Sequence, residues 1–319
     1  MLARLLPDRF ILWLLGTVVL AVLLPVTGNA AQAVDLLTLA AIFALFLLHG
    51  VRLPREALLS GVTDWRLHLA ILALTFAIFP LIGLALARAW PGLLAPQLWT
   101  GLLFLCALPS TVQSSIAYTS IARGNVAGAV AAAAYSNLIG VFLTPLLALL
   151  MLQAQSAQIS LAAFGRIFAL LFLPFVIGHA LRPLLLSFVE ARPAMTRTVD
   201  KGTILLAVYG AFSAATVEGV WRRLPPAELA VLSALLLALL GLVLGAAVLV
   251  GRLGGFARPS RAAILFCGSV KSLVAGAPMA RLLFPAAAAG LIILPIMIFH
   301  TLQLIVSAWI AGAMARQAP

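Results

Sequence analysis

Charged residues are almost confined to short gaps between long apolar stretches, and this spacing limits the fold more than any other feature of the sequence. A helix needs about 20 apolar residues to cross the hydrocarbon of a bilayer, and each stretch meets or approaches that length. The longest gap is the basic segment 182–201. The pattern predicts an all-α polytopic membrane protein with ten transmembrane helices. The apolar stretches cover residues 10–26, 36–51, 67–88, 98–122, 126–152, 160–181, 202–218, 229–250, 261–283 and 287–312.

The composition makes the lipid bilayer the first expected partner. Of the 319 residues, 64% are hydrophobic and 9% are charged, whereas a soluble domain is about 25% charged. Because so few charges cannot cover a water-facing surface, apolar side chains must face lipid. Helices are the natural spanning structure, since lipid offers no partner to unpaired backbone groups.

The net charge of +12 would suggest nucleic acid in a soluble protein. Here the basic residues flank apolar stretches, where they act as topology signals, so we expect no nucleic-acid partner. With an even number of spans both termini lie on one side, which collects 14 of the 20 arginines and lysines; five lie on the other side and Lys271 lies within a stretch. Both termini are therefore predicted to be cytoplasmic.

The N-terminal segment has the basic start and apolar run of a signal peptide. Its run of 17 residues, 10–26, is longer than a usual signal-peptide core, and the repeat described next needs this helix. We expect residues 4–26 to be retained.

Two short stretches resemble each other five segments apart. Residues 49–56 and 218–228 each contain a Gly-Val pair followed by Arg-Leu-Pro and a glutamate. Because five is odd, equivalent points lie on opposite sides of the membrane, as in an inverted repeat of five plus five helices. The alternative is a chance match between arginine- and leucine-rich stretches.

Two apolar stretches carry polar interruptions at corresponding places, near 108–113 and 267–272. Pro109 removes a helix hydrogen bond, and hydroxyl and amide side chains follow it directly. Helices broken at matching positions of two halves indicate a transporter's binding site, and their exposed N-termini suit anions. The alternative is a pair of ordinary kinked helices packed through small residues. The candidate substrate- or ion-binding residues are Ser110, Thr111, Gln113, Ser114, Ser115, Asn137, Cys267, Ser269, Lys271 and Ser272.

Lys271 is the most informative residue in these interruptions. A cation at the bilayer centre costs about 3 kcal/mol on insertion scales. All eight acidic residues lie at or near the ends of the stretches, so Lys271 must face a polar cavity, be neutral or hold an anion. We expect its amine near oxygens of residues 110–115; the alternative is that the side chain extends to the membrane interface.

Other polar residues within the stretches have two explanations each. Asn137 faces the polar centre or bridges helices, and the secondary candidates line the cavity or make helix-packing hydrogen bonds. No metal-ligand spacing, catalytic triad, Walker motif or dinucleotide fingerprint occurs, so neither an enzyme nor a cofactor is expected. Cys106 and Cys267 are expected to be small apolar fillers rather than a disulfide. The secondary candidates are Thr119, His300 and Gln303.

At these motifs the chain resembles the bile acid:sodium symporter superfamily, in the divergent SBF-like branch typified by the seventh vertebrate bile-acid carrier and its bacterial relatives. The resemblance rests on the proline–hydroxyl break before 122–125 (Ala-Arg-Gly-Asn), Leu-Thr-Pro at 143–145, and 266–273 (Phe-Cys-Gly-Ser-Val-Lys-Ser-Leu). It implies a bacterial inner (plasma) membrane protein of two inverted five-helix repeats. Substrate would bind between a core, whose broken helices 4 and 9 cross, and a panel, by alternating access. The panel would comprise 1–65 and 159–225, and the core 66–153 and 226–319.

The departures from the superfamily concern its sodium sites. Sodium-coupled members carry a glutamate at the start of the second break and a glutamine four residues on, and the resemblance places Cys267 and Lys271 there. The hydroxyl of Ser115 is kept, but the asparagine that follows it is Ile116.

Two further hydroxyl ligands of the superfamily are replaced by Ala129 and Ala133. Hard cations need oxygen ligands, so coupling to two sodium ions is not expected. The leading hypothesis is a secondary transporter of a small organic anion in which Lys271 takes the place of a coupling cation. The alternatives are a proton-coupled carrier that uses Lys271 and a membrane regulator that keeps the fold without transport.

Overall fold

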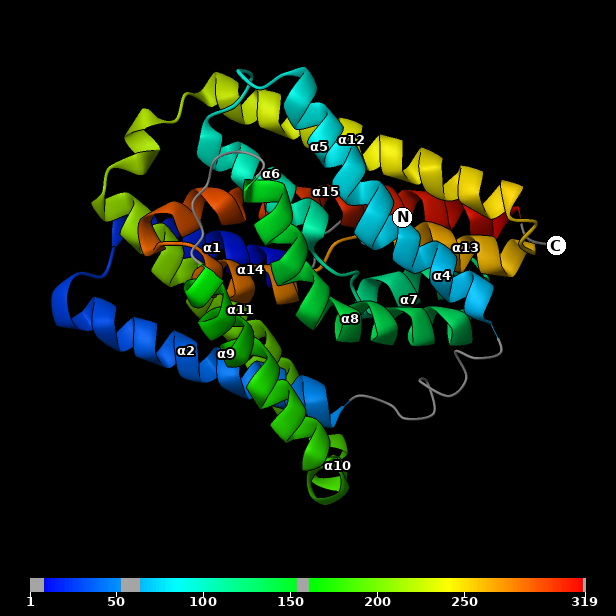
Figure 1. Ribbon diagram of the computed structural model, residues 1–319, viewed down its shortest axis with the longest axis horizontal. Helices are drawn as coiled ribbons and strands as arrows, with labels where there is room; N and C mark the ends of the chain where they lie inside the picture. The colour runs from blue at the N-terminus through cyan, green and yellow to red at the C-terminus, as the bar shows by residue number, and fades with distance from the viewer. Residues whose placement is uncertain (1–8, 53–63, 154–160, 318–319) are drawn as a thin grey trace. The chain divides into compact units, whose positions relative to one another are not determined.

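The computed structural model describes residues 9–52, 64–153 and 161–317, and in these ranges the chain is helical apart from short connections (Figure 1). A π-helical turn, η2, interrupts one span between α4 and α5, and η3 is a 3₁₀ turn. The elements are α1 (Arg9–Leu23), α2 (Gly28–Val51), α4 (Trp65–Ala73), η2 (Leu74–Ile78), α5 (Phe79–Ala89), α6 (Pro96–Ala107), α7 (Gln113–Ile121), α8 (Val126–Gln153), α9 (Leu161–Ala180), α10 (Arg182–Glu190), α11 (Pro193–Val217), η3 (Val220–Arg223), α12 (Pro226–Leu253), α13 (Arg258–Gly268), α14 (Leu273–Leu283) and α15 (Ala286–Arg316).

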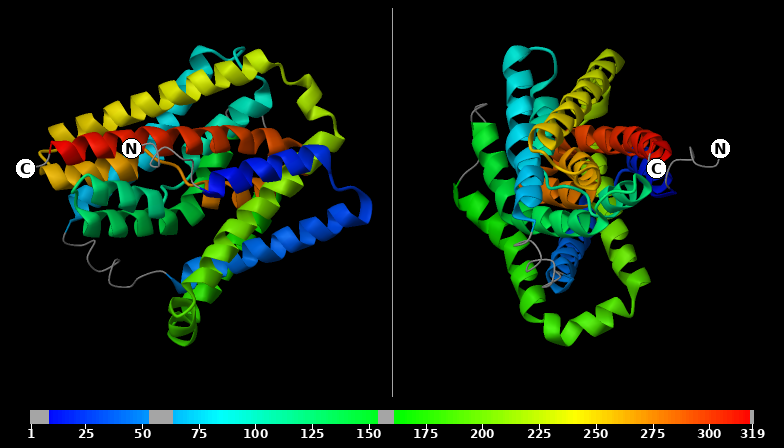
Figure 2. Two further views of the ribbon diagram at one scale, coloured as in Figure 1. Left: turned by 180° about the vertical axis from the view of Figure 1, so that it is seen from behind. Right: turned by 90° about the vertical axis from the view of Figure 1, so that its right-hand side faces the viewer.

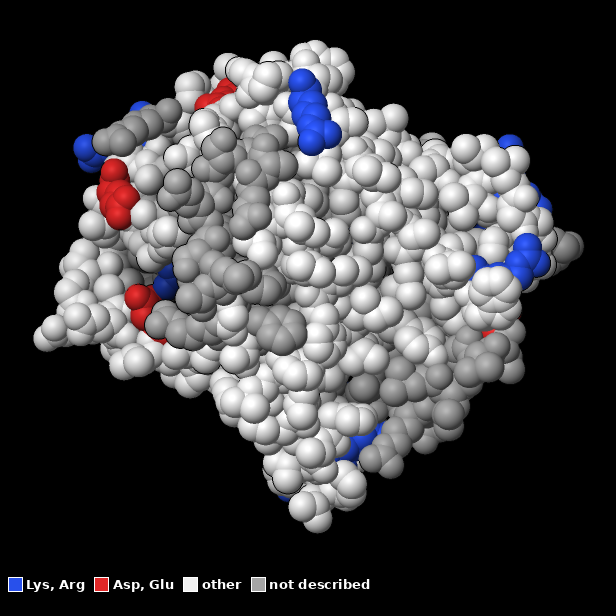
Figure 3. All heavy atoms as spheres, viewed as in Figure 1, with Lys and Arg blue, Asp and Glu red and all other residues white. Residues whose placement is uncertain are grey.

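The helices have the length and apolar character of membrane spans. Among the described residues, six continuous or nearly continuous helical segments qualify by length and composition, and the α9–α10 pair, bent by 88°, would be a seventh. Large apolar side chains such as Trp13, Leu23 and Trp309 are exposed, as lipid contact requires. On the face shown in Figure 3, uncharged residues occupy most of the surface and charged residues lie mostly near its margins. The all-helical polytopic membrane protein is thus confirmed, while the ten-span inverted repeat stays a prediction.

Two helices begin well before the apolar stretches, and one expected connection is mostly helical. The structure begins α2 at Gly28 and α11 at Pro193, earlier than residues 36 and 202. Residues 182–201, expected to be a connection, are mostly helical. The prediction was wrong here because hydropathy marks only the part of a helix inside hydrocarbon, whereas hydrogen bonding continues through turns with polar side chains.

The contacts divide the chain into two units. The first comprises Met1–Leu53, Gln158–Leu229 and Val274–Leu294; the second comprises Pro54–Ala157, Ala230–Leu273 and Pro295–Pro319. The predicted core and panel differ from these units in placing 274–294 with the core, and that four-part division stays a prediction.

Within the first unit, α2 and α9 cross at a pair of glycines (Figure 1). A Cβ on Gly178 would lie 2.0 Å from the Leu47 carbonyl oxygen, and a Cβ on Gly50 would lie 2.0 Å from the Phe175 carbonyl oxygen. Neither distance is physically possible, so each helix needs a glycine where the other's backbone passes. The crossing is therefore fixed by backbone contact.

Within the second unit, α12, α13 and the later part of α15 run alongside one another (Figure 2). Ala247, Ala263 and Ala311, one from each helix, share a buried cluster with Ala129 of α8 and Cys267. Small residues let helices approach closely in a membrane, where packing replaces the hydrophobic effect as the main attraction. This packing includes Cys267, which lies just before the second helix interruption.

Candidate functional site

Two helical segments are interrupted where the sequence places its polar runs. The first ends at Ala107 and resumes at Gln113, and Leu108 is extended with φ −69° and ψ 154°. This conformation is the one that the following Pro109 imposes on its neighbour. The second ends at Gly268 and resumes at Leu273. Each interruption leaves backbone groups that must find partners outside their own helix.

Lys271 lies in the second interruption and is completely buried. Its Nζ donates to three backbone carbonyl oxygens, those of Thr75 at 2.7 Å, Cys106 at 2.7 Å and Leu108 at 2.6 Å. It also lies 4.2 Å from the centre of the Phe79 ring, within cation–π distance. The amine therefore reaches the end of α6 and the π turn, not the predicted oxygens of residues 110–115. The expectation erred because the carbonyls orphaned by a helix end precede the break rather than follow it.

The Thr75 carbonyl is available to Lys271 because of the π turn. The N–H of Phe79, its α-helical partner, donates to the carbonyl of Leu74 instead. The residue after Phe79 is Pro80, which has no N–H to offer. Neither Phe79 nor Pro80 therefore donates to the Thr75 carbonyl, which accepts a hydrogen bond from Lys271 Nζ instead.

The other carbonyls of the first interruption are satisfied from neighbouring segments. The Thr144 hydroxyl donates to Ala107 O at 2.9 Å, and the Ser272 N–H donates to Pro109 O at 2.9 Å. Consecutive carbonyls from Cys106 to Pro109 therefore each accept a hydrogen bond from outside α6.

Ser110 joins the two interruptions directly. Its hydroxyl donates to the Cys267 carbonyl at 2.6 Å, and its N–H donates to the Ser136 hydroxyl at 2.9 Å. Its carbonyl accepts from Asn137 Nδ2 at 3.2 Å, and Asn137 also donates to Ala133 O within α8. Asn137 thus faces the polar centre and also bridges helices, so both explanations given for this residue apply.

Gln303 of α15 holds the backbone of Lys271. Its Oε1 accepts from Lys271 N at 2.7 Å, while its Nε2 donates to Lys271 O at 2.8 Å, and the side chain is completely buried. Gln303 Nε2 also lies 2.9 Å from His300 Nδ1. The side-chain amide takes the place of a peptide group that would pair with Lys271, so it fixes the residue that carries the amine.

Several predicted hydroxyls bond mainly within their own segments. Ser115 Oγ donates to the carbonyls of Thr111 and Val112, and Thr119 Oγ1 donates to Ser115 O at 2.8 Å. The hydroxyls of Thr111 and Ser114 lie 2.6 Å apart. These bonds tie the start of α7 to the residues just before it.

The remaining predicted residues differ in exposure. Ser269 and Ser272 are buried, and Ser269 Oγ donates to Leu265 O in the last turn of α13. Gln113 is exposed at the first position of α7. The structure thus brings Ser110, Asn137 and Lys271 with its neighbours together, and leaves Gln113 at the surface.

Apolar packing surrounds the positions that the family resemblance places at sodium sites. Ala129, Ala133 and Cys267 are completely buried, and Cys267 Sγ lies 3.8 Å from Ala129 O. The one retained hydroxyl, that of Ser115, donates to the Thr111 carbonyl just before α7. This donor set lacks the several oxygens that a hard cation prefers.

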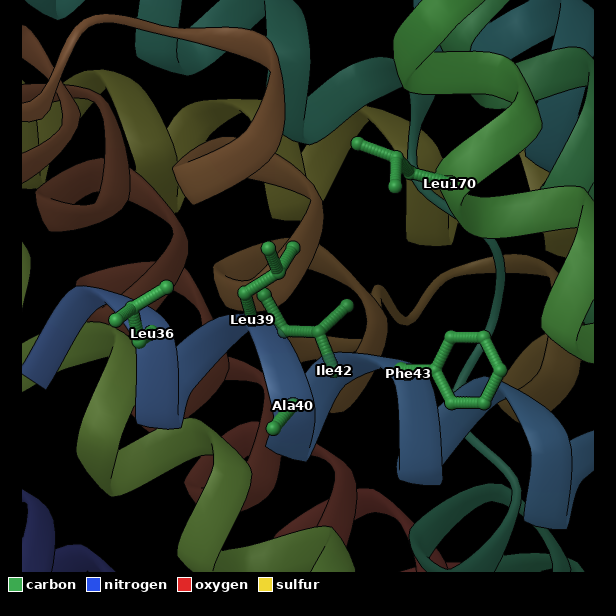
Figure 4. A pocket seen from close by; sticks show the side chains of 6 residues that line it. All are labelled: Leu36, Leu39, Ala40, Ile42, Phe43 and Leu170. Carbon is green, nitrogen blue, oxygen red and sulfur yellow. The ribbon is translucent and has the colours of Figure 1, made fainter.

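The first unit contains an apolar pocket of about 260 Å³ (Figure 4). Side chains of α2 and one of α9 line it, and none can form a hydrogen bond. The hydrogen-bonding chemistry therefore belongs to the interruptions. The lining residues are Leu36, Leu39, Ala40, Ile42, Phe43 and Leu170.

Five residues of the site were missed from the sequence as oxygen partners or donors: Thr75, Cys106, Leu108, Ser136 and Thr144. A signal existed for two of them. Thr75 precedes Pro80 by five residues, the spacing that frees a π-turn carbonyl, and Ser136 adjoins Asn137.

Interrupted helices that share their backbone partners inside an apolar bundle define a membrane transporter. The chain belongs to the SBF-like CPA transporter family, whose sequence model matches residues 8–316. It is 47% identical to uncharacterized protein PA2026 of Pseudomonas aeruginosa, over 98% of this chain and 95% of that protein. It is 43% identical to a protein of Escherichia coli K12 named "Putative symporter YfeH", over 97% and 93% of the two chains. It is 26% identical to sodium/bile acid cotransporter 7 of Danio rerio, over 98% and 97%. The resemblance to the SBF-like branch is confirmed.

Proposed function

We propose that this protein is a secondary active transporter that moves a small organic anion by alternating access, with Lys271 in place of a coupling cation. Its family and its symporter- and cotransporter-named relatives support transport. Two-sodium coupling is not part of the proposal, because the aligned positions carry Cys267, Ala129 and Ala133 in place of oxygen ligands.

The observation that carries the proposal is the set of three carbonyls around the Lys271 amine, at 2.6 to 2.7 Å. Carbonyl oxygens freed by unwound helices are the ligands that transporters offer to coupling ions. Here a covalently attached ammonium takes those ligands. It holds the interruption together as a bound ion would, but it cannot dissociate, so no gradient of that ion drives the cycle.

The same geometry favours a fixed charge over a proton shuttle. A protonated lysine has three N–H donors, and the three carbonyls use all of them. A neutral amine has two donors and would turn its lone pair toward one carbonyl oxygen. The arrangement therefore fits the ammonium form, and loss of its proton would leave one buried carbonyl unsatisfied.

Flux measured in proteoliposomes tests the proposal. Purified wild-type protein should take up a radiolabelled organic anion when a concentration gradient of that anion is imposed, with equal rates in sodium and potassium buffers. The Lys271→Met variant, reconstituted to the same density, should show no flux above protein-free vesicles. Absence of flux for every anion tried, by folded wild-type protein, would favour the non-transporting regulator. Uptake driven only by a proton gradient and lost with Lys271→Met would favour the proton-coupled carrier.

A further inference from the structure

The first unit, like the second, contains a cationic side chain that is largely buried. Arg281, near the end of α14, keeps 8% of its side-chain surface accessible. Its partner is Asp35 of α2, whose side chain is 54% accessible, and Arg281 Nη2 donates to Asp35 Oδ1. The pair is unequal: the guanidinium is buried and its carboxylate faces outward.

The guanidinium has more donors than this partner uses. Arginine carries five N–H groups in a planar fork. Arg281 Nε is buried and has no hydrogen-bond partner among the described residues. A buried N–H without a partner destabilises the fold, which is unexpected for a residue whose role is only structural.

The guanidinium also lies near the backbone of α11. A Cβ built on Gly210 of α11 would lie 3.6 Å from Arg281 Nη2, in ordinary van der Waals contact. A glycine at this position therefore leaves space beside the guanidinium. The Asp35 side chain is 54% accessible, so it has room to turn away from Arg281.

We propose that Arg281 binds the oxyanion group of the transported substrate, and that Asp35 occupies the guanidinium when no substrate is bound. This inference rests on the proposed function and deepens it by assigning the charged end of the substrate to one residue. The ligand class is a carboxylate or sulfonate, because the planar fork of arginine binds two oxygens of one such group at once. The unused Nε supplies the second donor.

Binding of benzoate and benzenesulfonate to detergent-purified protein tests the proposal without requiring transport. Thermal stability is titrated with each anion at constant ionic strength against chloride, with benzyl alcohol as the uncharged control. Both anions should stabilise the wild-type protein saturably, and benzyl alcohol should not. Asp35→Asn removes the competing carboxylate and should raise the apparent affinity about fivefold, the factor for an ion pair of about 1 kcal/mol. Arg281→Gln should abolish the stabilisation, and Arg281→Lys should weaken it.

Asp200→Asn is the matched control, since Asp200 forms another inter-helix ion pair of this unit, with Arg52. It should leave anion affinity unchanged. Unchanged or weaker binding by Asp35→Asn overturns the proposal, as does wild-type affinity in Arg281→Gln or the absence of binding to wild-type protein. A protein that binds both anions through Arg281 but moves none across a vesicle would instead contradict transport alone.

Discussion

Replacing Lys271 with methionine tests the central contact of the site. Methionine fills similar volume but donates no hydrogen bond, so it leaves the carbonyls of Thr75, Cys106 and Leu108 without this donor. Orphaning one buried polar group costs about 1–3 kcal/mol. Removal of the buried charge recovers part of that loss, since its desolvation penalty disappears. We therefore expect a net destabilisation of about 3 kcal/mol.

Differential scanning fluorimetry in detergent measures this loss. A change of this size should lower the melting temperature by roughly 5–10 °C in a chain of this length. Lys271→Gln should fall between wild type and methionine, since its amide can still donate two hydrogen bonds.

The sequence supplies a matched control in Lys201, the one other lysine, which is exposed on α11. Lys201→Met should melt within about 1 °C of the wild type, since exposed substitutions usually change stability by less than about 0.5 kcal/mol. Wild-type melting and flux in Lys271→Met would refute the argument, as would equal losses in the two variants.

Four further outcomes are expected. Gln303→Leu should lower the free energy of unfolding by about 3 kcal/mol in a thermal melt, because it leaves both backbone groups of Lys271 without this partner. Gln303→Glu, which keeps the acceptor, should lower it less, and the reverse order would contradict the pairing of Gln303 with the Lys271 backbone. Gly178→Val should prevent folding or cost about 3 kcal/mol, because its side chain meets the α2 backbone, whereas Gly165→Val on the same helix meets open space and should be tolerated. Sodium titrated against potassium should give no saturable, sodium-specific stabilisation. A sodium-specific stabilisation that Ser115→Ala abolishes would contradict this prediction and indicate a sodium site. A reporter fused after the last residue should register the cytoplasm, and intact mass should retain residues 4–26; a periplasmic signal would reverse the topology.

The interruption of the helices could be predicted because its causes are local. Pro109 removes a donor and forces an extended residue before it, and the hydroxyls after it can bond to freed backbone groups. The burial of Lys271 followed from its distance in sequence from any charged flank. Both conclusions need no knowledge of which helices are neighbours.

The partners of the amine could not be predicted, because they depend on that knowledge. Thr75 lies 196 residues from Lys271 in the sequence, and its carbonyl is free only through a π turn in an otherwise regular span. Likewise, His300 and Gln303 are one turn apart and fit either a cavity or helix packing by sequence. Only the contact with the Lys271 backbone distinguishes the role of Gln303.

The sequence separation of these bonds has a consequence for how the protein is made. The carbonyls of Cys106 and Leu108 accept from Lys271, which is synthesised 165 and 163 residues after them. The ribosome adds about 5–20 residues per second, so the first interruption enters the bilayer many seconds before Lys271 exists. During that interval its carbonyls need water or a protein partner, since lipid offers none. A chain stopped before residue 271 is therefore expected to stay bound to the insertion machinery, and one extended past α15 to leave it.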